Sequence, residues 1–293
     1  MADDAPGASD RTIRAILAAA SARLARSATP RLDAELLLAH AFGIERDALL
    51  LDLDTTRAVP PAFRAYVARR ERHEPIAYIT GTRGFWSIDL AVGPGALVPR
   101  ADSETLIEAA VAHRGAAPTR ILDLGTGPGT LLLAALAQWP QARGLGVDAS
   151  ADALAYAVRN AATLGMADRA AFVRGDWATA IEARFDLVFA NPPYVATGDD
   201  LPSEVVDHEP GTALFAGAEG LDAYRALAGQ LGRLIAPGGV ALLEIGHRQA
   251  SAVGALLAAR GLAATVARDL GGRDRCLVVA PCPVVLPCPV VLP

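Results

Sequence analysis

Lysine is absent from this chain of 293 residues, so all 27 of its basic side chains are arginines. A Walker A phosphate loop ends in Gly-Lys-Ser or Gly-Lys-Thr, and the absence of lysine excludes that class of nucleotide-binding protein. Schiff-base and pyridoxal chemistry need a lysine amine, so they are excluded as well. Any catalysis by this chain must therefore proceed without a lysine.

Cysteine is nearly absent, because the sequence contains only Cys276, Cys282 and Cys288. They form no CxxC pair, so we expect no metal site and reduced thiols. The acidic start MADDAPGASD is not followed by an apolar h-region, and no apolar run reaches membrane-spanning length. We therefore expect a soluble, cytoplasmic protein with no membrane partner.

Positive charge is also in the minority, since the net charge is −5 and the isoelectric point is about 5.6. A basic face that binds bare nucleic acid directly is therefore not expected, although a local basic groove would be compatible with this balance.

The first part of the chain predicts a small domain of helices. Residues 1–10 indicate a disordered N-terminus, and residues 11–74 have apolar residues at helical spacing, as in a helical bundle. Its last predicted helix carries four arginines: Arg64, Arg69, Arg70 and Arg72. We favour a solvated helix face for them, with a docking surface for a partner as the alternative.

The middle and last parts of the chain change character. Residues 75–102 predict a β-hairpin linker, in which Phe85–Val92 pairs with Ile76–Thr80. Strands and helices then alternate over 103–280, which indicates an α/β domain with a doubly wound parallel sheet and ligands at the carboxyl ends of its strands. Residues 281–293 form a proline-rich tail to which we assign no function.

A glycine-rich turn follows the predicted strand at 120–124. Its residues are Gly125, Thr126, Gly127, Pro128 and Gly129. Glycines let the backbone turn sharply beside a ligand, whereas Pro128 removes an N–H that a pyrophosphate could have used. The turn therefore favours a nucleoside ligand without phosphates over a dinucleotide, although a plain tight turn is the structural alternative.

Acidic and aromatic residues end the next two predicted strands. Asp148 lies about twenty residues beyond the turn, where a carboxylate can accept hydrogen bonds from ribose hydroxyls. A helix N-cap is the alternative for Asp148. Asp176 could accept from an adenine amino group, and Trp177 could pack on the ring, although it could equally be a core residue.

The fourth strand of this domain ends in Asn191-Pro192-Pro193-Tyr194. An amide nitrogen is a poor nucleophile because its lone pair is delocalised into the carbonyl. Asn191 can accept one hydrogen of a planar NH₂ group, and the carbonyl of Pro192 can accept the other, while Tyr194 stacks on the group. We therefore expect Asn191, Pro192 and Tyr194 to be catalytic, and all four residues to hold the substrate.

With these residues the sequence resembles the PrmC/HemK family, which methylates the N5 of glutamine in peptide chain release factors. The resemblance runs from about residue 12 to 280. It is carried by EPIAYITGTRGFWSIDLAVGPGALVPRADSETL (74–106), DLGTGPG (123–129), NPPY (191–194) and HEPGTALFAGAEGL (208–221).

The resemblance implies a Rossmann-like class I methyltransferase domain with a doubly wound mixed sheet, dependent on S-adenosyl-L-methionine. It implies cofactor contacts from Gly125–Gly129, Asp148, Trp177 and Asn191, and a substrate glutamine held by Asn191–Tyr194. It also implies that residues 11–74 dock a class I release factor, whose Gly-Gly-Gln motif carries the target.

Two other functions are compatible with parts of this pattern. NPPY also occurs in adenine-N6 methyltransferases of DNA and RNA, which extrude the base from the helix. The acidic isoelectric point argues against that function, and salt-dependent DNA binding would favour it. A non-catalytic nucleoside-binding or scaffold protein is the second alternative, and the intact NPPY argues against it.

Overall fold

The structure is a computed structural model that describes residues 11–113 and 117–282. The predicted disordered N-terminus and almost all of the proline-rich tail lie outside these residues. The chain divides into two compact units: one comprises the residues up to Gly81 together with Leu201–His208, and the other comprises Thr82–Asp200 and the residues from Glu209 onward. No helix among the described residues is long and apolar enough to cross a membrane.

The first unit is a helical bundle with a core of its own. Its elements are β1 (Arg11–Thr12), α1 (Ile13–Arg23), α2 (Pro30–Phe42), α3 (Arg46–Leu51), β2 (Thr56–Arg57), α4 (Pro61–Arg70), α5 (Ile76–Thr80) and α9 (Ser203–Val206). Thr12 caps α1 by accepting a hydrogen bond from the N–H of Ala15. Pro30 is the first residue of α2, where the missing N–H of a proline removes no helical hydrogen bond, and Gly43 caps the end of the helix in the left-handed region.

One arginine of α4 departs from the predicted solvated face. Arg70 is buried, and its guanidinium binds Asp33 at 2.6 Å and Glu204 at 2.7 Å. Arg64 and Arg72 are exposed as expected. The prediction was wrong for Arg70 because the sequence spacing does not reveal that two carboxylates from other helices surround it.

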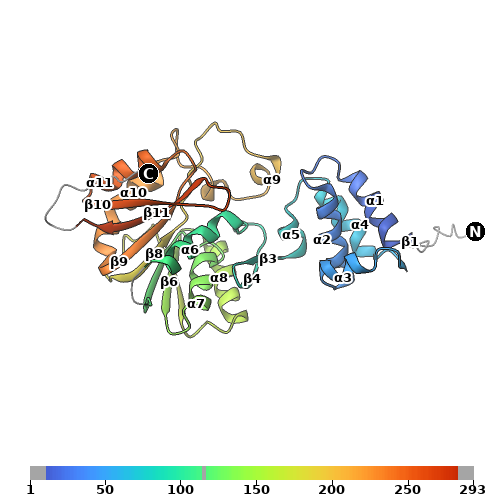
Figure 1. Cartoon of the computed structure of the whole chain (residues 1–293), viewed down its shortest axis with the longest axis horizontal. Coiled ribbons are helices and arrows are strands. Elements are labelled where there is room, and N and C mark those ends of the chain that lie inside the picture. Colours follow the sequence, from blue (N-terminus) through green and yellow to red (C-terminus); the bar gives the residue numbers. More distant parts are fainter. Residues whose placement is uncertain (1–10, 114–116, 283–293) are drawn as a thin grey trace, which may run out of the picture. The chain divides into compact units, whose positions relative to one another are not determined.

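The second unit is built on a seven-stranded sheet in the order β10-β11-β9-β8-β5-β6-β7 (Figure 1). The strands are β5 (Arg120–Leu124), β6 (Arg143–Asp148), β7 (Ala170–Arg174), β8 (Phe185–Ala190), β9 (Ile235–Glu244), β10 (Leu262–Arg268) and β11 (Asp274–Pro281). Strands β5 to β9 are parallel to one another, whereas β11 is antiparallel to both β9 and β10. The sheet is therefore mixed, because β10 and β11 follow each other without a helix between them.

Consecutive residues of the central strands are buried, as expected where helices cover both faces of a sheet. The covering elements of this unit are α6 (Glu104–Ala112), α7 (Thr130–Gln138), α8 (Ala151–Thr163), α10 (Asp222–Leu234) and α11 (Ala250–Ala258), with two 3₁₀ turns, η1 (Ala101–Ser103) and η2 (Gly211–Ala213). Helices α10 and α11 share one core cluster with Leu122 and Leu124 of β5.

The predicted hairpin exists with a different partner strand. It consists of β3 (Thr82–Phe85) and β4 (Ile88–Ala91), whereas Ile76–Thr80 is the helix α5. Pro75 directly precedes that helix, and Gly81 ends it at φ 77°. The sequence prediction therefore placed the first strand of the hairpin one element too close to the N-terminus, in the residues that form α5.

Candidate functional site

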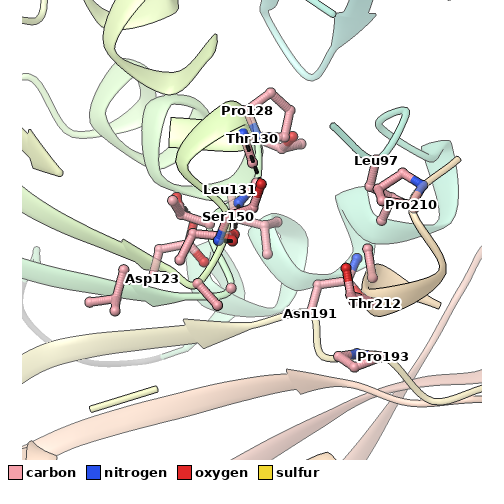
Figure 2. A pocket seen from close by; sticks show the side chains of 18 of the residues that line it. Leu97, Asp123, Pro128, Thr130, Leu131, Ser150, Asn191, Pro193, Pro210 and Thr212 are labelled. Carbon is pink, nitrogen blue, oxygen red and sulfur yellow. Dashed lines mark hydrogen bonds between the residues drawn. The ribbon is translucent and has the colours of Figure 1, made fainter. Parts of the chain in front are cut away.

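The carboxyl ends of β5, β6, β7 and β8 open onto one pocket. Figure 2 shows Asp123, Pro128, Thr130, Leu131 and Ser150 on one side of it, and Leu97, Asn191, Pro193, Pro210 and Thr212 on the other. The lining includes nine of the predicted residues: Gly125, Thr126, Gly127, Pro128, Asp148, Asp176, Trp177, Asn191 and Pro193. Pockets at this edge are expected in open α/β sheets, because the loops after the strands converge there.

The glycine-rich turn is held in a conformation that few other residues adopt. Gly125, Gly127 and Gly129 have φ values of 73°, 57° and 87°. A Cβ added at Gly127 would meet nothing within 4 Å, so backbone is presented to open space in the pocket. Gly129 does not line the pocket, and its added Cβ would collide with Leu133 at 2.8 Å. The turn therefore offers bare backbone to a ligand while its last glycine allows close packing of α7.

Asp148 fastens this turn to the next strand. Its Oδ2 accepts a hydrogen bond from the N–H of Gly127 and its Oδ1 accepts one from the N–H of Ser150, both at 2.8 Å. The cap of α8 is Ser150, whose hydroxyl accepts from the N–H of Ala153. Asp148 is thus not the N-cap, and each of its oxygens retains a lone pair for a further donor.

Trp177 has a strained backbone beside the turn. Its φ is 49°, in the left-handed region that disfavours a bulky side chain. Its ring lies 3.5 Å from the position that a Cβ on Gly125 would occupy. Such strain persists where the surroundings impose it, and it often accompanies binding sites.

Asp123 is a pocket residue that the sequence reading did not single out as a site residue. It is 1% exposed, and its Oδ2 accepts hydrogen bonds from Thr126 Oγ1 at 2.6 Å and from the N–H of Leu132 at 3.2 Å. Its Oδ1 has no hydrogen-bond partner among the described residues. The pKa of Asp123 is raised to about 7, mainly by burial and to a smaller extent by the charge of Asp148, while the hydrogen bonds from Thr126 and Leu132 oppose the rise.

The NPPY residues have different surroundings from one another. Asn191 and Pro193 line the pocket, Pro192 is buried, and Tyr194 is not among the lining residues. Asn191 Nδ2 donates to Ser103 Oγ at 3.2 Å. The hydroxyl of Tyr194 donates to Glu244 Oε1 at 3.3 Å, and burial raises the pKa of that hydroxyl. The structure thus gives Asn191 and Pro193 the pocket-facing positions.

Two segments that the sequence reading left without site residues complete the wall of the pocket. Glu209 accepts a hydrogen bond from the N–H of Val98 at 3.0 Å and forms an ion pair with Arg100. This buried carboxylate joins the segment before η1 to the segment before η2, and residues of both line the pocket. Both lie in the runs 74–106 and 208–221 that carry the family resemblance, which was the available indication.

Comparison with known proteins identifies the family. Residues 15–81 match the family model described as the PrmC N-terminal domain, and residues 101–209 match the methyltransferase small domain. The release factor glutamine methyltransferase of Rhodospirillum rubrum is 48% identical over 256 residues, covering 85% of this chain and 78% of that protein. This chain belongs to the release factor glutamine methyltransferase family.

Another member of the family supports this assignment, and a solved structure shares the fold. The release factor glutamine methyltransferase of Caulobacter vibrioides is 42% identical over 256 residues, which cover 85% of this chain and 89% of that protein. A methyltransferase structure from Pyrococcus furiosus has a TM-score of 0.51 at 17% identity, over 74% of this chain and 95% of that chain. The second likeness shows the fold alone: an α/β, Rossmann-like methyltransferase domain.

Proposed function

We propose that this chain transfers a methyl group from S-adenosyl-L-methionine to the side-chain amide nitrogen, N5, of a glutamine in peptide chain release factors. The observation that carries the proposal is the position of Asn191. It directly follows β8 and lines the same pocket as the glycine-rich turn after β5, in a chain that is 48% identical to a release factor glutamine methyltransferase. One pocket thus joins a nucleoside cradle to an amide acceptor.

The residues of the pocket fit such a cofactor. Polar groups for a nucleoside with an amino-acid tail come from the open backbone at Gly127, the lone pairs of Asp148 and the Oδ1 of Asp123, which has no partner among the described residues. The proposed cofactor contacts are the predicted residues that line the pocket: Gly125–Pro128, Asp148, Asp176, Trp177 and Asn191. Gly129, which was also predicted, is not among the lining residues. S-adenosyl-L-methionine supplies a methyl group already activated on its sulfonium, so no metal or lysine is needed.

The chain's own task is to prepare the amide nitrogen. The lone pair of this nitrogen becomes available when acceptors hold the two NH₂ hydrogens and orient the group so that the lone pair points toward the methyl carbon. We assign Asn191 Oδ1 and the backbone carbonyl of Pro192 as the two acceptors, with Pro193 and Tyr194 shaping the substrate subsite. The tie between Tyr194 and Glu244 supports a positioning role for this tyrosine in addition to the predicted stacking.

We further propose that the partner is a class I release factor whose target glutamine lies in a Gly-Gly-Gln motif. Two glycines beside the target carry no side chains, so an exposed loop could enter a narrow site. The first unit of the chain, which matches the PrmC N-terminal domain, is the proposed docking domain.

The test offers three substrates with labelled cofactor: an intact release factor, a short peptide bearing the motif, and duplex DNA. We expect label on the release-factor glutamine, located by mass spectrometry, with weaker labelling of the peptide because it lacks remote contacts. Label on DNA adenine with none on the glutamine would overturn the proposal in favour of the nucleic-acid alternative. The absence of transfer to any substrate would favour a binding protein.

A further inference from the structure

A chain of polar side chains runs from Asn191 into the protein interior. Asn191 Nδ2 donates to Ser103 Oγ, and Ser103 is only 2% exposed. Glu244, the last residue of β9, is also 2% exposed and accepts the hydroxyl hydrogen bond of Tyr194 on Oε1. The other oxygen of Glu244, Oε2, has no hydrogen-bond partner among the described residues.

The hydroxyl of Ser103 does not cap the helix that follows it. It stands directly before α6 at the N-cap position, where a serine hydroxyl normally accepts from the helix N–H groups, yet it makes no capping hydrogen bond. It accepts from Asn191 instead, and its own proton must then be donated elsewhere. The carboxyl of Glu244 is close enough for the Ser103 hydroxyl to influence its pKa, and its Oε2 lacks a donor among the described residues, which makes it the candidate acceptor.

The hydrogen bonds of Ser103 give this chain a direction. Burial raises the pKa of Glu244, and the Ser103 hydroxyl, the Arg275 guanidinium and the Tyr194 hydroxyl oppose that rise. In either charge state a carboxyl keeps an oxygen that can accept the Ser103 hydroxyl hydrogen. A serine that donates this hydrogen has only lone pairs to offer Asn191, in agreement with the hydrogen bond that Ser103 accepts from Asn191 Nδ2.

We propose that Ser103 and Glu244 form a positioning relay that sets the orientation of the Asn191 amide, with Nδ2 held by Ser103 and Oδ1 free for the substrate amide. The proposal rests on the proposed function, in which Asn191 Oδ1 accepts a hydrogen of the glutamine NH₂. A flipped Asn191 would offer a donor to a donor, and the substrate amide would lose its alignment. Glu244 also binds Tyr194, so it supports both ends of the NPPY segment.

The experiment compares Ser103→Ala, Ser103→Thr and Glu244→Gln with the unaltered full chain. Release-factor methylation is measured as separate kcat and KM values, and calorimetry and thermal unfolding report cofactor affinity and folding. We expect Ser103→Ala and Glu244→Gln to lower kcat on the order of 10- to 100-fold with little change in KM or cofactor affinity, since a small misplacement of a reacting group costs this much. Ser103→Thr keeps the hydroxyl and should retain most of the activity.

A double-mutant cycle separates the relay from a structural role. If Ser103 acts through Asn191, adding Ser103→Ala to Asn191→Ala should cause little further loss of kcat. Unchanged kcat in Ser103→Ala, equal losses in the alanine and threonine variants, or multiplying losses in the cycle would overturn the relay. If Glu244→Gln does not fold, the serine variants and the cycle still decide. Failure of the unaltered chain to methylate the release factor would instead refute the proposed function.

Discussion

Asn191 is the single residue on which the proposed chemistry depends most directly. It directly follows β8 and lines the pocket, and its Nδ2 donates a hydrogen bond to Ser103. We predict that Asn191→Ala lowers the methylation rate on the order of 10²- to 10³-fold, because one positioned acceptor and the alignment of the lone pair are lost. Single-turnover kinetics would measure the loss, and circular dichroism would check folding. Near-normal turnover in the variant would refute the amide-acceptor role.

Asp148 is expected to act on the cofactor alone. Its carboxylate fastens Gly127 and retains lone pairs for two ribose hydroxyls. We predict that Asp148→Ala weakens cofactor binding by roughly 2 to 3 kcal/mol, since the two ribose hydroxyls lose a charged hydrogen-bond acceptor. Titration calorimetry measures this directly, with Asp168→Ala as a control at an exposed acid. If the two variants bind equally well, Asp148 serves only to hold the turn.

Asp123 should make stability depend on pH. Its folded-state pKa is raised by burial from 3.8 to about 7, so the folded protein keeps a proton that the unfolded chain releases as the pH rises between these values. The free energy of unfolding therefore falls across this window, by at most about 4 kcal/mol from this group. We predict that Asp123→Asn removes this part of the decline. Thermal unfolding from pH 4 to pH 8 gives both curves, and parallel curves would contradict the expectation.

At the scale of elements, one buried asparagine joins three parts of the second unit. Asn160 of α8 accepts from the N–H of Ala91 at 2.7 Å and donates to the carbonyls of Ala91 and Pro128 at 3.1 and 2.9 Å. It thereby ties the hairpin strand β4 to the glycine-rich turn.

We predict that Asn160→Ala lowers the free energy of unfolding by about 2 to 4 kcal/mol, because buried backbone groups lose their partners. Cofactor binding should weaken as well, since the turn is no longer held. Denaturant unfolding and calorimetry measure the two effects, with the exposed neighbour Arg159→Ala as the control. A stability loss no larger than the control's would show that these groups find other partners.

The elements show where reasoning from sequence succeeds. Local patterns predicted β5, the glycine-rich turn and β8 with its NPPY end, because alternation, glycine spacing and chain order are encoded within a few residues. The pairing of Ile76–Thr80 was wrong, because a short apolar run fits a helix and a strand equally well. Glu244 and Ser103 escaped prediction for a different reason: Ser103 is 88 residues from Asn191 in sequence, and such contacts have no spacing pattern.

At the scale of the whole molecule, the two units have separate hydrophobic cores. Residues such as Leu17 and Leu37 form one, and Leu122 and Leu231 belong to the other. The chain nevertheless leaves the second unit after Asp200, contributes Leu201–His208 to the first unit and returns at Glu209. The excursion begins only a few residues beyond NPPY, and its Glu204 binds the buried Arg70. The first unit therefore includes a segment that lies, in the sequence, between residues that line the pocket of the second unit.

This arrangement predicts what removal of residues 1–81 would do. The second unit keeps its core, the glycine-rich turn and Asp148, so cofactor affinity should change little. Methylation of an intact release factor should fall by at least about tenfold, because remote binding contacts that orient the target loop are lost. A short motif peptide cannot use those contacts, so its slower reaction should change less. The ratio of the two rates, measured with labelled cofactor for the full and shortened chains, isolates docking from chemistry. If both substrates lose activity equally, the first unit acts by anchoring the segment after NPPY, and Arg70→Met in the full chain should then reproduce the loss with both substrates.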